Sequence, residues 1–119
     1  MKKLLSICIP TRNRFHTLKK NIDHLSKIIV DNNFENFVDV IISDNSLINN
    51  RFNENFFYKL PFIKYFISDD LGHDINILNL INNANSDYIW LCQDHAKIID
   101  NELKNIIDVI ISKEKDYIF

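Results

Sequence analysis

Four short polar clusters, each directly after a run of apolar residues, hold most of the side chains that could do chemistry. They are Thr11-Arg12-Asn13-Arg14, Asp44-Asn45-Ser46, Ser68-Asp69-Asp70 and Gln93-Asp94-His95. The carboxylates could bind a metal ion, and the imidazole of His95 suits Mn²⁺-like metals better than Mg²⁺. The guanidinium of Arg12 could pair with a phosphate or stack on a base. These clusters are therefore candidates for a ligand-binding site.

The elements that must position these clusters follow from the apolar patterns. Continuous apolar runs predict four strands, at residues 4–9, 38–43, 62–67 and 88–92. We expect Pro10 to end the first strand, since proline cannot continue the hydrogen-bond ladder. Helical spacing predicts helices after a cap at Thr17 or a neighbour, over residues 74–84, and after a cap at Asp100. Residues 47–60 are expected to be a loop with one short helix at 53–58, and residues 116–119 to begin a fifth strand.

Strands that alternate with helices and read as continuously apolar indicate one fold class. They predict an α/β fold of three α/β/α layers, with a mostly parallel sheet covered on both faces. Ligands of such sheets bind beyond the carboxyl ends of the strands. All four polar clusters lie there, so we expect them to meet at one edge of the sheet.

The composition limits the classes of protein to which this chain can belong. The 119 residues are 46% hydrophobic and 25% charged, which suits a single domain over residues 1–119. The net charge of −2 gives no basic footprint for nucleic acid. Cys8 and Cys92 are interpreted as buried free thiols in a reducing compartment. Without a signal-peptide core or an apolar run of about 20 residues, we expect a cytoplasmic chain, with docking to the inner face of the membrane left open.

Gly72 is the only glycine. A P-loop needs two glycines and a GxGxxG loop needs three, because the backbone must approach phosphate closely. P-loop, kinase-like and dinucleotide-binding sites are therefore excluded. A signalling receiver domain would carry paired acids after the first strand, where this chain has Pro10-Thr11-Arg12-Asn13, and we reject it.

The order and spacing of four segments resemble family 2 glycosyltransferases of the GT-A fold. The first segment, LSICIPTRNR at residues 5–14, resembles their opening strand, which reads roughly VSIVIPTYNR. The second, VIISDNS at residues 40–46, resembles their second strand and its acid. The third, at residues 71–78, resembles the "lGxxxN" entry to a helix, and the fourth, at residues 86–95, resembles the strand that carries the DxD motif.

The resemblance implies a donor-binding site for a nucleotide-sugar, most often a UDP-sugar. Asp44 would accept a hydrogen bond from the base, because a carboxylate only accepts and suits an imide N–H. The nucleotide-binding residues that it implies are Pro10, Thr11, Arg12, Asn13, Asp44, Gly72, Asn76 and Gln93. The enzyme would transfer the sugar, with inversion, to a glycan or lipid-linked acceptor in cell-surface polysaccharide biosynthesis. Sugar nucleotidyltransferases share a related fold, but their glycine-rich opening loop cannot be built here.

The resemblance also implies a divalent cation, Mn²⁺ or Mg²⁺, that bridges the diphosphate and stabilises the leaving group. Asp94 and His95 occupy the metal-binding positions. The triad departs from the family, because Gln93 and His95 stand where relatives carry carboxylates. Either His95 ligates a softer ion, or metal binding is weakened or lost.

The catalytic base of such enzymes lies well downstream of the DxD motif, and we expect it beyond Phe119. The chain is therefore interpreted as an apparently truncated GT-A domain, the donor-binding half, whose sheet needs further chain or a partner chain to complete it. The alternative is a non-catalytic nucleotide-binding or interaction domain derived from such an enzyme.

Overall fold

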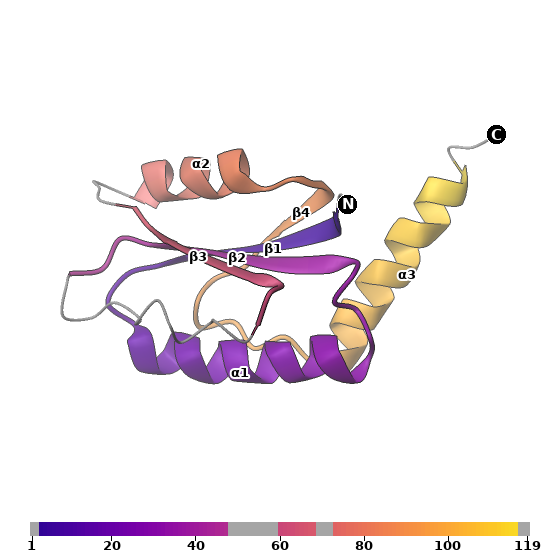
Figure 1. Cartoon of the computed structure of the whole chain (residues 1–119), viewed down its shortest axis with the longest axis horizontal. Coiled ribbons are helices and arrows are strands. Elements are labelled where there is room, and N and C mark those ends of the chain that lie inside the picture. The colour runs from indigo at the N-terminus through magenta and orange to yellow at the C-terminus, as the bar shows by residue number, and fades with distance from the viewer. Residues whose placement is uncertain (1–2, 48–59, 69–72, 117–119) are drawn as a thin grey trace.

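A computed structural model, which describes residues 3–47, 60–68 and 73–116, shows a four-stranded sheet with three helices (Figure 1). The strands are β1 (Lys3–Thr11), β2 (Val38–Asp44), β3 (Ile63–Ile67) and β4 (Ser86–Leu91). The helices are α1 (Phe15–Asp31), α2 (His73–Asn83) and α3 (Asp100–Asp116). The sheet order is β3-β2-β1-β4 and every pair is parallel. The predicted α/β class with a parallel sheet is confirmed.

The helices cover opposite faces of the sheet, with α1 on one face and α2 on the other (Figure 1). The larger core lies on the α1 side and joins the apolar stripe of α1 to β1 and β2. Leu103, Ile107 and Ile110 bring α3 into this same core. A smaller cluster of Cys8, Ile41 and Leu80 lies under α2. The three-layer arrangement is therefore as predicted.

Strand β4 differs from the expectation of a sheet covered on both faces. Tyr88 and Trp90 pack against the larger core, but Ile89 and Leu91 are 43% and 47% exposed. The reason is that α2 packs mainly on β1 and β2, so it leaves this face of the edge strand open. The continuous apolar run of β4 was interpreted as burial on both faces, and the structure buries only one.

The first strand continues past Pro10, which corrects the predicted end at Ile9. Pro10 pairs with Ser43, and the strand reaches Thr11 opposite Asp44. The carbonyl of Cys8 accepts a hydrogen bond from the Cys92 N–H on the β4 side. Pro10, two residues later, faces the same side, where β4 has already ended at Leu91. Its missing N–H therefore removes no bond to β2.

The structure changes the predicted start of the first helix and the predicted fifth strand, and it confirms the predicted start of the third helix. Thr17 does not cap α1, which begins at Phe15 after Arg14 and has no side-chain cap. Helix α3 begins at Asp100 as expected, but it runs through Asp116, so the predicted fifth strand cannot include that residue. Residues 117–119 lie outside the described residues, as do the predicted short helix at 53–58 and the acidic pair Asp69-Asp70.

Both cysteines are free and buried, as predicted. Burial raises the pKa of the Cys8 thiol to about 11, with a further contribution from Asp39. Burial likewise raises the pKa of the Cys92 thiol to about 12. Both groups therefore stay protonated at neutral pH. Over the described ranges, none of the helices has the length and apolar character needed to cross a membrane.

Candidate functional site

The parallel register brings three of the four polar clusters together at the carboxyl edge of the sheet. Thr11 lies opposite Asp44, and the segment that follows β4 runs beside the end of β1. Between them lies a cavity of about 560 Å³. Its lining residues are Pro10, Thr11, Arg12, Arg14, Asn45, Asn76, Gln93, Asp94 and His95. The volume lies in the range of small-molecule sites, roughly 300–1,000 Å³.

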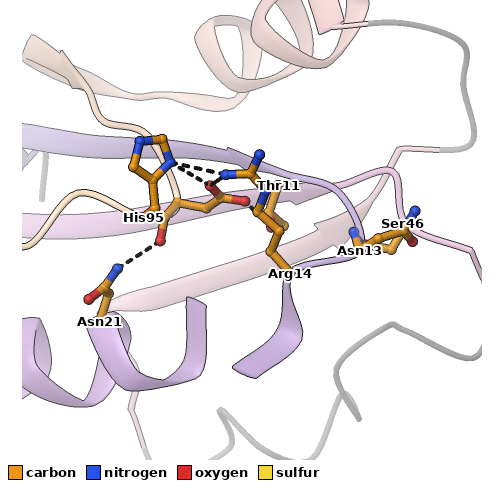
Figure 2. Close-up of polar contacts among 7 residues, drawn as sticks. Thr11, Asn13, Arg14, Asn21, Ser46 and His95 are labelled. Atoms are coloured by element: carbon orange, nitrogen blue, oxygen red, sulfur yellow. Dashed lines mark hydrogen bonds and ion pairs between the residues drawn. The ribbon is translucent and has the colours of Figure 1, made fainter. Parts of the chain in front are cut away.

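Asp94 is a buried side chain of this cavity, at 7% exposure. The Thr11 hydroxyl donates to its Oδ2 at 3.0 Å, and Arg14 Nη1 donates to its Oδ1 at 3.3 Å. Asn21 on α1 donates from Nδ2 to the Asp94 backbone carbonyl at 2.8 Å (Figure 2). Strand β1, the loop after it and α1 thus hold one carboxylate in a fixed position.

His95 points toward Arg14 (Figure 2), and its Nδ1 lies 3.1 Å from Arg14 Nη1. A guanidinium can only donate hydrogen bonds, so Nδ1 would be the acceptor of a hydrogen bond between these two groups. Asp94 Oδ1 lies 3.4 Å from the same Nδ1, which places the guanidinium between two acceptors.

The predicted metal ligands do not fit a divalent cation in this arrangement. Asp94 Oδ1 accepts from Arg14 Nη1 at 3.3 Å, and His95 Nδ1 lies 3.1 Å from the same nitrogen. Gln93 supplies an amide in place of a carboxylate. No group of three or more His, Cys, Asp or Glu side chains converges anywhere in the described part of the chain. A divalent cation bound here would lie close to the positive charge of Arg14.

Asn13 lies beside the cavity and does not line it. Its φ of 56° is in the left-handed region, which asparagine tolerates better than most residues. Its N–H donates to Ser46 Oγ at 2.6 Å (Figure 2). Its Oδ1 accepts from the Leu47 N–H at 3.0 Å. Asn13 thus ties the β1–α1 loop to the loop after β2, between the two arginines that do line the cavity.

Asp44 is buried at 1% exposure and also lies outside the cavity lining. Its Oδ1 accepts from the Ser46 N–H at 2.8 Å, and its Oδ2 accepts from the Tyr65 hydroxyl at 2.5 Å. These bonds give the carboxylate a structural function, to fix the loop after β2. Its predicted contact with a base stays a prediction.

Asn76 lines the cavity at 2% exposure, as expected for a nucleotide-binding residue. It is fixed by Ser43, whose hydroxyl donates to Asn76 Oδ1 and whose carbonyl accepts from Asn76 Nδ2 at 3.2 Å. This pair joins α2 to the end of β2. Gly72, the other predicted residue at this helix, lies outside the described residues.

Two lining residues, Arg14 and Asn45, were missed when binding residues were assigned from the sequence. Both stand inside the polar clusters, so their position was a signal. Asn45 is 9% exposed, and its buried Oδ1 has no hydrogen-bond partner. Arg12 donates to the backbone carbonyl of Asn45 at 3.4 Å. Such an unpaired buried acceptor could take a hydrogen bond from a ligand or a water that reaches it.

Comparison with known proteins agrees with this geometry. The family model described as glycosyl transferase family 2 matches residues 6–119. The abequosyltransferase RfbV of Salmonella typhimurium (strain LT2) is 30% identical to this chain over 131 aligned residues. The alignment covers 95% of this chain and 36% of that relative. The chain thus spans about a third of the length of the curated relative that it matches.

Proposed function

Because this chain belongs to glycosyl transferase family 2, we propose that it is the donor-binding part of an enzyme that transfers a sugar from a nucleotide-sugar. The acceptor would be a glycan or a lipid-linked glycan, in the assembly of a cell-surface polysaccharide. Similarity to a protein named an abequosyltransferase supports sugar transfer. The proposal includes inversion at the sugar carbon.

The observation that carries the proposal is the charge of the cavity. Its described lining has two guanidinium groups, from Arg12 and Arg14, and one carboxylate, from Asp94. The net positive charge suits a diphosphate, since guanidinium groups bind phosphate oxygens through paired N–H donors. Buried Asn45 and Asn76 add amide groups that could recognise a base or a ribose. Such a site suits a nucleoside diphosphate with its sugar.

The test measures thermal unfolding of this chain with UDP, CDP, GDP and dTDP, each with and without Mn²⁺. A ligand at 100 times its Kd should stabilise the folded chain by about 2.7 kcal/mol. We expect at least one diphosphate to raise the unfolding temperature. Arg12→Glu should remove that shift, because it reverses a lining charge. Lys20→Glu, an equal reversal at an exposed position of α1, should preserve it.

No shift with any of the four diphosphates would contradict the proposal.

One observation favours a second function, a nucleotide-binding domain without catalysis. Asp94 is the only carboxylate of the described cavity lining, and Thr11 and Arg14 already engage it. Binding of a nucleotide-sugar without its hydrolysis, and without transfer to any acceptor, would support this second function.

A further inference from the structure

We propose that Arg14, and not a divalent cation, neutralises the diphosphate in this cavity. The inference rests on the proposed function, because it concerns how the same site would hold its nucleotide. Arg14 lies at the junction of β1 and α1 and is 54% exposed in its side chain. It thus combines fixed contacts on one side with room for a ligand on the other.

The first argument concerns the contacts of Asp94. Its Oδ1 accepts from Arg14 Nη1 at 3.3 Å, and its Oδ2 accepts from the Thr11 hydroxyl at 3.0 Å. His95 Nδ1 lies 3.1 Å from the same Arg14 nitrogen. A guanidinium therefore already lies beside both predicted metal ligands, and a metal ion would have to share the Asp94 carboxylate with it.

The second argument concerns charge. A single carboxylate faces two guanidinium groups in the described lining. Asp94 offsets one of these charges, so the lining keeps one positive charge to meet a diphosphate. A divalent cation would enter against that remaining charge, with only Asp94 to attract it. The electrostatic balance favours direct binding of phosphate.

The third argument concerns the free donors of Arg14. A guanidinium carries five N–H groups in a planar fork, and the contacts to Asp94 and His95 use Nη1 alone. The remaining donors of this half-exposed group are available to phosphate oxygens. Asp94 and His95 are then positioning residues, which fix the direction of the fork before the ligand arrives.

The experiment uses the diphosphate that stabilises the chain most in the panel above. Its Kd is measured by calorimetry in EDTA, in Mg²⁺ and in Mn²⁺, together with the Kd of the nucleoside that has the same base. For the unchanged chain we expect the three Kd values of the diphosphate to agree within about twofold. Binding that needs Mg²⁺ or Mn²⁺ would overturn the inference and leave the proposed function standing.

Substitution at Arg14 separates ligand binding from folding. Arg14→Gln should weaken diphosphate binding roughly 10- to 100-fold, the range for a lost charged hydrogen bond, and leave nucleoside binding unchanged. Arg14→Lys, which keeps a point charge, should recover part of the affinity. Lys20→Gln is the matched control on exposed α1. An equal loss for nucleoside and diphosphate would show a merely structural role and overturn the inference. If no diphosphate binds in any condition, both proposals fail.

Discussion

Asn45 is a cavity-lining residue with an unpaired buried acceptor. It directly follows β2, its N–H donates to the Thr11 carbonyl at 3.1 Å, and its side chain lines the cavity. Its Oδ1 is buried and unpaired. A buried acceptor without a donor is unfavourable by about 1–3 kcal/mol. A ligand N–H or O–H at this atom would remove that penalty, so Asn45 should distinguish ligands by the donors they carry.

Replacing Asn45 with Leu should therefore affect binding more than folding. The substitution removes the acceptor and keeps a side chain of similar size. We expect the Kd of the nucleoside diphosphate to rise about 3- to 10-fold, which corresponds to one neutral hydrogen bond. Calorimetry measures the Kd, and urea denaturation measures stability.

The matched control is Asn82→Leu, at an exposed position of α2, which should leave the Kd unchanged. Equal affinity for the Asn45 variant and the unchanged chain would show that the ligand makes no contact with this amide. A large loss of stability would show instead that Asn45 is mainly a structural residue.

At the scale of elements, a second polar cluster joins the strands near their amino ends. Asp39 on β2 is 1% exposed. Its Oδ1 accepts from the Ser6 hydroxyl on β1 at 2.5 Å, and Lys64 Nζ on β3 lies 3.3 Å from its Oδ2. Ser86 on β4 donates to the Ser6 hydroxyl at 2.6 Å. All four strands therefore contribute to holding one buried carboxylate.

Lys64→Gln should destabilise the sheet, because it leaves the Asp39 carboxylate buried without its cation. We expect a loss of about 1 kcal/mol, at the lower end of the range for an unpaired buried group, since the Lys64 side chain is 54% exposed and partly screened by water. The midpoint of urea denaturation at neutral pH measures the loss. Lys97→Gln, at an exposed position, is the control; an equal midpoint for both variants would contradict the prediction.

Sequence patterns predict well the elements that are buried on one face, or on both faces, over several residues. The four strands and three helices lie close to their expected bounds, because apolar runs and the stripe of α1 reflect packing directly. The exposed face of β4 could not be predicted, since Ile89 and Leu91 are apolar whether or not a neighbour covers them. The ion pair of Asp39 could not be predicted either, because a single acid within an apolar strand does not indicate which residue of β3 lies beside it.

The location of the candidate site could be predicted from the sequence, but only some of its contacts could. The parallel sheet indicated that all four polar clusters meet at one edge. The clusters at Thr11, Asp44 and Asp94 do so, and Ser68 of the fourth cluster donates its N–H to the Asp44 carbonyl at 2.8 Å, whereas Asp69 and Asp70 lie outside the described residues. The contact between Arg14 and Asp94 joins residues 80 positions apart, so it depends on register and loop direction, which local patterns do not give. The left-handed backbone at Asn13 is one feature that sets the direction of this loop, because it lies between Arg12 and Arg14.

At the scale of the whole molecule, the charge of the chain and the charge of its cavity have opposite signs. The chain carries a net charge of −2, whereas the described lining has two guanidinium groups against one carboxylate. A diphosphate would therefore be attracted by a local field and not by the protein as a whole. Such a field is screened by salt, since the Debye length falls from about 10 Å at 0.1 M to about 3 Å at 1 M salt.

Salt should therefore weaken diphosphate binding and leave nucleoside binding almost unchanged. A nucleoside shares the base and ribose contacts but lacks the charge that Arg12 and Arg14 attract. We expect the Kd of the diphosphate to rise several-fold between about 0.1 M and 1 M NaCl, measured by calorimetry at constant pH. If both ligands weaken equally, salt acts on the fold or on the apolar contacts. If neither ligand weakens, the two guanidinium groups do not contribute to recognition, and the positive charge of the cavity does not serve to bind phosphate.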